Sequence, residues 1–199
     1  MLKVNKKPTL VAYVKAAERY SHYDEFEYEI KEVLRASLID EQNHYCPYCE
    51  RIIQNEQGKC HIEHIKPRST FSKLSREYSN LILSCDNRNT CGNRKGNEYT
   101  EEFIDSVIDE PSEYLKYDLS SGEIYAIDNN PKGTYTINIL NLNQKNLKEM
   151  RRNKMYTFVD LDMATQLELI DWEMEHMGKQ GCEFPQMILE LKASIDQAI

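Results

Sequence analysis

Two stretches of sequence decide the fold: CPYCERIIQNEQGKCHIEHIKP at residues 46–67 and NLILSCDNRNTCGNRKGN at residues 80–97. The first stretch opens with two cysteines separated by two residues, a spacing that lets both thiolates of a knuckle reach one zinc ion. The second contains two cysteines separated by five residues, which would complete a tetrahedral set of four sulfurs. The predicted zinc ligands are Cys46, Cys49, Cys85 and Cys91. A site closed by four protein ligands leaves no open position, so we expect this zinc to be structural.

The expected cellular compartment favours metal binding by the cysteines over disulfide formation. No apolar run approaches the roughly 20 residues needed to cross a bilayer, and charged residues interrupt the apolar positions of the first 20 residues. We therefore expect a cytoplasmic protein without a membrane segment, in which thiols stay reduced. Cys60 and Cys182 are expected to be core thiols, with His44 or Cys60 as a substitute zinc ligand. The alternative is that all six cysteines are ordinary buried thiols.

Charge divides the chain unevenly. Residues 43–98 carry 9 Lys and Arg against 6 Asp and Glu, whereas residues 99–199 carry 9 against 19 and residues 1–42 carry 7 against 8. Lys and Arg contacts to phosphate supply most of the sequence-independent affinity for nucleic acid. Only the middle segment is therefore equipped to approach a phosphate backbone, and the acidic tail is expected to face solvent or a protein partner.

Helical patterns flank the cysteine-rich segment. Before it, the spacing predicts a helix at about 9–20 and a clearer one at 23–38, where apolar residues recur at helical intervals. Within it, we expect a strand at 59–65, a short helix at about 71–78, a brief apolar segment at 80–85 and then another short helix.

After it, residues 112–128 predict a hairpin that turns at Ser121 and Gly122. A long helical region is expected from about 144 to 177, and a last helix after Pro185. The predicted class is α+β, mostly helical, with a small zinc-stapled core. The predicted division is an N-terminal helical cover (1–42), a core (43–100), and a hairpin with a C-terminal helical region for partner docking (101–199).

HIEHIKPRS (61–69), NLILSC (80–85) and CGNRKGN (91–97), in this order around the cysteines, resemble the ββα-metal motif of HNH nucleases. That resemblance implies a metal-dependent endonuclease. The motif positions fall on Glu63 and His64, on Asn80, and on Asn93. The last position is usually His in that family, so Asn93 is a departure, and Asn89 or Asn97 are alternatives for it.

The chemistry of phosphodiester hydrolysis suits these residue types. A neutral imidazole, here His64, can deprotonate a water. Glu63 and the carboxamide of Asn93 offer the oxygen ligands that Mg²⁺ or Mn²⁺ prefers, beside the scissile phosphate. Asn80 is expected to hydrogen-bond the loop or backbone near His64 and so to orient its ring.

One geometric conflict arises on the predicted strand. In a regular strand Glu63 and His64 point to opposite faces, whereas His61 and Glu63 share one face. A twist or bulge near Pro67 would bring the side chains together. His61 is therefore open between an extra metal ligand, a phosphate contact and a hydrogen-bonded neighbour. The cations expected near phosphates are Lys66, Arg68, Arg88, Arg94 and Lys95.

A wider resemblance covers most of the chain, including YLKYDLSSGEI (114–124) and ILNLNQKNLKEMRRNKM (139–155). These flanks, with the core motifs, are similar to the PtuB nucleases of the Septu and retron-associated anti-phage defence systems. The resemblance implies a PtuA-type ATPase partner, and this chain has no GxxxxGK[ST] phosphate-binding loop of its own.

Two other functions remain open. One is a non-catalytic zinc-bearing adaptor that binds nucleic acid or protein, and the other is a structural helical partner that binds no metal. The resemblance to HNH nucleases favours DNA as the substrate, with RNA as the alternative. No base-reading element that would specify a sequence is identifiable.

Overall fold

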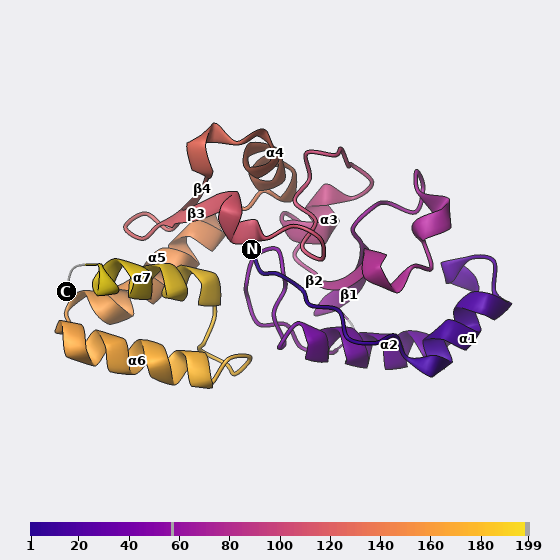
Figure 1. Ribbon diagram of the computed structural model, residues 1–199, viewed down its shortest axis with the longest axis horizontal. Coiled ribbons are helices and arrows are strands. Elements are labelled where there is room, and N and C mark those ends of the chain that lie inside the picture. The colour runs from indigo at the N-terminus through magenta and orange to yellow at the C-terminus, as the bar shows by residue number, and fades with distance from the viewer. Residues whose placement is uncertain (57, 198–199) are drawn as a thin grey trace.

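A two-stranded antiparallel sheet forms the centre of the molecule (Figure 1). The computed structural model describes residues 1–56 and 58–197. Strand β1 (Cys60–His64) pairs with β2 (Leu81–Cys85) in a continuous register, with Cys60 opposite Cys85 and His64 opposite Leu81. The short helix α3 (Cys91–Lys95) follows. The expected strand, apolar segment and short helix are therefore confirmed, but the paired residues contain no bulge.

Two helices precede the sheet, α1 (Val11–Arg19) and α2 (Tyr28–Glu41). Helix α2 packs against β2, and α1 packs against α2. Helix α2 buries Leu34 and Leu38 completely. The predicted helix at 23–38 is wrong at its start, because residues 23–25 form a separate 3-10 turn and Phe26 is extended. That turn places the centroid of the Phe26 ring 5.5 Å from the centroid of the Tyr13 ring on α1. This apolar contact takes the place of the first turn of the predicted helix.

The short helix predicted at 71–78, in the connection between the strands, is wrong. The connection contains two 3-10 turns, Ser72–Leu74 and Tyr78–Asn80. The Leu74 carbonyl accepts hydrogen bonds from the Glu77 backbone N–H at 3.1 Å and from the Asn80 side chain at 3.1 Å. In an α-helix that carbonyl would bond residue 78 instead, so the Asn80 side chain competes with helix formation.

The C-terminal part begins with the predicted hairpin, β3 (Leu115–Asp118) and β4 (Glu123–Ala126). An unpredicted helix, α4 (Pro131–Leu140), packs against β4, where a Cβ on Gly133 would lie 2.8 Å from the Ala126 Cβ. Its start was legible in the sequence, because the Asn130 side chain caps it and Pro131 opens its first turn.

Three further helices complete the chain: α5 (Lys145–Val159), α6 (Met163–Glu175) and α7 (Pro185–Asp196). The long helical region predicted at 144–177 is thus two helices. The Asp162 carboxylate accepts a hydrogen bond from the Thr165 N–H at 3.1 Å and so begins a new helix. These helices lie at the opposite end of the molecule from α1 (Figure 1).

One cluster of buried apolar side chains draws on all three expected segments, for example Val4, Leu34, Leu83, Leu140 and Ile195. The division at residues 42 and 100 stays a prediction. Within residues 1–56 and 58–197, every helix is too short or too polar to cross a membrane.

Candidate metal centre and active site

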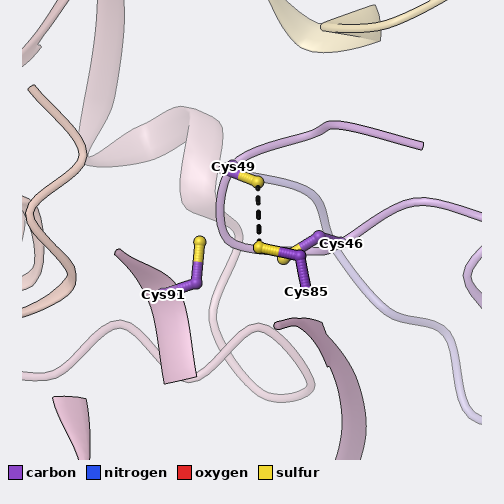
Figure 2. Close-up of side chains that lie close together, drawn as sticks. All are labelled: Cys46, Cys49, Cys85 and Cys91. Atoms are coloured by element: carbon purple, nitrogen blue, oxygen red, sulfur yellow. Dashed lines mark hydrogen bonds between the residues drawn. The ribbon is translucent and has the colours of Figure 1, made fainter. Parts of the chain in front are cut away.

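Four cysteine sulfurs converge beside the central sheet (Figure 2). Cys46 and Cys49 lie on the loop after α2, Cys85 ends β2 and Cys91 begins α3. All four are buried, and their sulfurs lie within 4.8 Å of one another. The sulfurs of Cys49 and Cys85 are 3.8 Å apart, the separation of about 3.8 Å that four thiolates bound tetrahedrally at about 2.3 Å would have. The cluster could hold a metal such as zinc.

The other cysteine and histidine candidates lie apart from this cluster. Cys60 contacts the Gln54 carbonyl at 3.2 Å and the Arg35 guanidinium at 3.3 Å, and Cys182 is buried elsewhere. Among the described residues, neither Cys60 nor His44 joins the four sulfurs. Burial raises the pKa of Cys46, but hydrogen bonds from the other three thiols hold that pKa well below its ordinary value. The hydrogen bond with Cys46 raises the pKa of Cys49 well above its ordinary value, and burial does the same for Cys91. The cluster therefore favours a thiolate at Cys46, whereas Cys49 and Cys91 would have to lose their protons on binding a metal.

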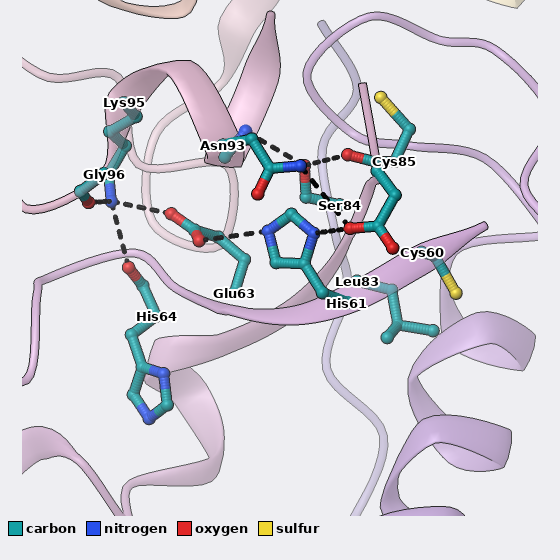
Figure 3. Close-up of polar contacts among 12 residues, drawn as sticks. Cys60, His61, Glu63, His64, Leu83, Ser84, Cys85, Asn93, Lys95 and Gly96 are labelled. Carbon is teal, nitrogen blue, oxygen red and sulfur yellow. Dashed lines mark hydrogen bonds and ion pairs between the residues drawn. The ribbon is translucent and has the colours of Figure 1, made fainter. Parts of the chain in front are cut away.

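Strand β1 sorts the candidate side chains onto two faces, as a regular strand requires. His61 and Glu63 face one another on one side, with 3.5 Å between His61 Nε2 and Glu63 Oε2. Figure 3 shows the His64 ring turned away from both. Because β1 has no bulge, these three side chains do not converge on one point.

The space beside His61 and Glu63 depends on Gly92 in α3. A Cβ at residue 92 would lie 2.7 Å from His61 Nε2 and 2.9 Å from Glu63 Oε2. Because Gly92 has no side chain, the α3 backbone can lie close to His61 and Glu63, and the gap between His61 Nε2 and Glu63 Oε2 stays open. The Gly92 N–H donates to the buried Ser84 hydroxyl at 3.0 Å, which fixes the backbone there.

The His61 and Glu63 side chains each contact one further residue through their other polar atom. His61 Nδ1 lies 2.7 Å from Asp86 Oδ1. Glu63 Oε1 lies 2.6 Å from Lys95 Nζ, and the Lys95 side chain is fully buried (Figure 3). Burial lowers the pKa of His61, but its hydrogen bonds with Glu63 and Asp86 outweigh that effect and raise the pKa above its ordinary value. The gap between His61 and Glu63 is therefore a place that favours positive charge.

His64 occupies a buried, less polar setting. Its Nε2 lies 2.9 Å from the Ser75 carbonyl, and its ring packs edge-on against the Tyr23 ring at 4.9 Å. A carbonyl only accepts hydrogen bonds, so Nε2 carries the proton and Nδ1 keeps its lone pair. Burial lowers the pKa of His64 to about 4. The ring is therefore neutral at pH 7.

The Asn80 side chain forms hydrogen bonds that stabilise the loop containing Ser75. Its Oδ1 accepts from the Lys66 N–H at 2.8 Å, and its Nδ2 donates to the carbonyls of Lys66 and Leu74 at 3.0 and 3.1 Å. Asn80 is thus bonded to the backbone of the loop, and the His64 ring is hydrogen-bonded to the Ser75 carbonyl of that loop.

A pocket of about 250 Å³ joins the two faces of β1. It is lined by His61, Glu63, His64, Asn93 and Asn97, among others. Asn89 does not line it, so two of the three candidates for the last motif position border the same space as the histidines.

The predicted phosphate-binding residues differ in whether they border the pocket. Arg68 lines the pocket and contacts the Asp24 carboxylate. Lys95 does not suit this role, because its buried ammonium pairs with Glu63 instead of facing solvent. Lys66 lies over the Phe71 and Tyr99 rings, whereas Arg88 and Arg94 are exposed away from the pocket.

Sequence reasoning missed Tyr23, Asp86 and Gly92 as parts of the site. Asp86 directly follows Cys85, and Gly92 directly follows Cys91. Their places beside two predicted zinc ligands were legible in the sequence, but their contacts with His61 required the register of β1 and β2.

Comparison with known proteins finds a similarity to a Septu protein. The chain is 29% identical over 119 residues to the Septu protein PtuB of Bacillus thuringiensis. The matched region covers 57% of this chain, which spans about two fifths (42%) of that protein's length. No family model matches the chain. The similarity supports the expected relationship to Septu proteins.

The donor set around the pocket fits a divalent cation. His61 Nε2 and Glu63 Oε2 are an imidazole nitrogen and a carboxylate oxygen facing a common gap, and the carboxamide of Asn93 borders the same pocket. Carboxylate and carboxamide oxygens suit Mg²⁺ and Mn²⁺, and an imidazole nitrogen shifts the preference toward Mn²⁺ and other transition metals.

Proposed function

We propose that this protein is a metal-dependent endonuclease of the HNH kind that hydrolyses phosphodiester bonds in nucleic acid, with DNA as the favoured substrate over RNA. The observation that carries the proposal is the shared pocket. It brings a neutral imidazole, His64, to the same space as the facing acceptors of His61 and Glu63.

In this proposal His64 is the general base. Its Nε2–H is held by the Ser75 carbonyl, so the lone pair of Nδ1 is the atom that takes a proton from water. The low pKa keeps the ring neutral at pH 7, so the lone pair of Nδ1 is not blocked by a proton. Asn80 is a positioning residue, because it fixes the loop whose carbonyl orients the ring.

His61, Glu63 and Asn93 would hold the cation. When bound, a divalent ion supplies positive charge beside the scissile phosphate and the leaving oxygen. Glu63 keeps one oxygen for this role, because Lys95 occupies the other. Arg68 borders the same pocket and would contact a phosphate once it is released from Asp24.

One observation favours the second candidate, a non-catalytic zinc-bearing adaptor. The buried ammonium of Lys95 already neutralises the charge of Glu63. A carboxylate neutralised in this way attracts a divalent ion less strongly, and the adaptor needs only the four-cysteine cluster.

The deciding experiment is a plasmid-nicking assay with purified, zinc-loaded protein in Mg²⁺ or Mn²⁺. The variants are His64→Ala and, as the matched control, His176→Ala, which removes the histidine that directly follows the remote helix α6. Loss of a general base typically costs about 10²- to 10⁴-fold in rate. We expect that loss for His64→Ala and no change for His176→Ala. Equal nicking by His64→Ala and wild type would remove the catalytic assignment.

We further propose that the nuclease is the effector of an anti-phage defence complex with a PtuA-type ATPase. The similarity to the Septu protein PtuB supports this. The assay is therefore run with and without that ATPase, on DNA and on cellular RNA. Binding of nucleic acid without cleavage under any divalent ion, even with the ATPase present, would select the adaptor instead.

A further inference from the structure

Asp86 is bonded to two of the three residues that would hold the cation. Its Oδ1 lies 2.7 Å from His61 Nδ1, and the same oxygen accepts a longer hydrogen bond, 3.4 Å, from the Asn93 amide. His61 comes from β1 and Asn93 from α3. One carboxylate therefore ties together side chains from the two elements that border the gap.

The bond to His61 decides which ring nitrogen faces Glu63. An ionised carboxylate only accepts hydrogen bonds, so the proton of a neutral His61 ring lies on Nδ1. Nε2 is then left with its lone pair, pointing at Glu63 Oε2 across 3.5 Å. Two acceptors facing each other at this distance repel unless a cation or a proton lies between them.

The bond to Asn93 decides the orientation of the carboxamide. When the NH₂ group of Asn93 donates to Asp86, its carbonyl oxygen is the end left for other partners. That oxygen, and not the NH₂ group, is the end of a carboxamide that binds a hard cation.

The carboxylate itself is well anchored. Asp86 follows the last residue of β2, and its N–H donates to the Lys59 carbonyl at 3.1 Å. Its side chain remains about one quarter exposed, so replacing it removes little buried apolar surface. A change at Asp86 should therefore act on its hydrogen-bonded partners more than on the core.

We propose that Asp86 is a positioning residue for the catalytic cation: it does not touch the ion, but it sets the His61 tautomer and the Asn93 amide orientation. The inference rests on the proposed function. Outer partners of metal-binding histidines are typically worth about 10- to 100-fold in metal affinity.

The test measures Mn²⁺ binding to zinc-loaded protein by calorimetry and by electron paramagnetic resonance, without any cleavage assay. Asp86→Ala should weaken Mn²⁺ binding by about 10- to 100-fold while zinc content and melting temperature stay near wild type. Asp86→Asn should restore most of the affinity, because its side-chain oxygen can still accept from His61 and Asn93. Asp171→Ala, which removes a carboxylate paired with Lys192 on the remote helices, is the matched control and should bind normally.

The outcomes separate the inference from the proposed function. Saturable Mn²⁺ binding by the wild type that is unchanged in Asp86→Ala would overturn the role of Asp86 alone. A loss of affinity in both Asp86→Ala and Asp86→Asn, accompanied by loss of zinc, would reduce Asp86 to a structural residue. An absence of Mn²⁺ binding by the wild type would overturn the inference together with the catalytic metal site.

Discussion

Two histidines three residues apart on β1 have opposite environments. Carboxylates on both sides raise the pKa of His61, whereas burial lowers the pKa of His64 to about 4. His61 is therefore placed to face a positive charge, and His64 is placed to remain neutral. A cation-binding ring and a proton-accepting ring are the two roles that the proposed hydrolysis requires of its histidines.

Gly92 gives the sharpest residue-level prediction. In Gly92→Ala the new methyl group would lie 2.7 Å from His61 Nε2 and 2.9 Å from Glu63 Oε2, so both side-chain ends must move. Alanine favours a helix over glycine by about 1 kcal/mol, so stability should be kept. We expect Mn²⁺ affinity and nicking to fall at least about 10-fold, measured by calorimetry and the plasmid assay.

The control for this prediction is Arg94→Ala, which truncates an exposed side chain on the same helix. It should leave Mn²⁺ binding unchanged. Normal Mn²⁺ binding by a well-folded Gly92→Ala protein would mean that the cation does not lie between His61 and Glu63.

At the scale of elements, Asn80 organises the connection between β1 and β2. Asn80→Ala leaves the backbone groups of Lys66 and Leu74 without their side-chain partner, at a cost of about 1–3 kcal/mol for each buried group that finds no other partner. Because the loop also positions the Ser75 carbonyl, we expect a drop in nicking rate beyond the loss of folded protein. Chemical denaturation and single-turnover nicking measure the two effects.

Asn143→Ala is a matched control for that loop. Asn143 also makes a pair of backbone hydrogen bonds, to the N–H and carbonyl of Ile124 at 2.8 and 2.7 Å, but in the hairpin of the C-terminal part. It should destabilise the protein to a similar degree and leave the rate per folded molecule unchanged. Equal rate losses in both variants would assign Asn80 a purely structural role.

Periodicity and spacing predicted much at this scale. The four cysteines meet as their spacing indicated, and the hairpin turns where Gly122 allows a φ of +72°. The helix expected at 71–78 is replaced by two 3-10 turns, and the Asn80 side chain, six residues further along the chain, donates to the Leu74 carbonyl. Helical periodicity does not register such a side-chain bond to the backbone.

The candidate site was predicted less completely than the fold. Glu63, His64 and Asn93 do border one pocket. The burial of Lys95 depends on how α3 packs near Glu63, and the contact of Asp86 with His61 depends on the register of β1 and β2. No single stretch of sequence specifies either. The basic stretch of sequence around Lys95 therefore predicts a phosphate contact, whereas Lys95 pairs with Glu63 in the structure.

At the scale of the whole molecule, one apolar core is shared by all parts of the chain. We therefore predict that loss of the metal unfolds regions far from the cysteines. The single tryptophan, Trp172, lies on α6 and stacks on His176, at the end of the molecule remote from α1. Structural zinc contributes on the order of 10 kcal/mol in small domains. We expect chelation of zinc to unfold the chain in one transition, with zinc release and Trp172 fluorescence changing together.

Two cysteine variants refine this prediction. Cys49→Ser should lose the metal and melt as the chelated protein does, whereas Cys182→Ser, a buried thiol outside the cluster, should keep one zinc per chain. Elemental analysis counts the metal. A Trp172 signal that stays native after zinc has left would show that the C-terminal helices fold independently, in agreement with the division predicted at residue 100.

The adjacency of Cys85 with Asp86, and of Cys91 with Gly92, has a consequence for how the protein acquires its ions. The backbone that presents Asp86 and Gly92 to His61 is held by the sulfurs one residue before each of them. Under the proposed function, the nitrogen and oxygen donors would take their ion only after the sulfur cluster has taken its own. Sulfur ligands select zinc and oxygen ligands select harder ions, so the order of loading would follow from chain connectivity. A cell short of zinc would then produce a protein that is inactive even when manganese and magnesium are plentiful.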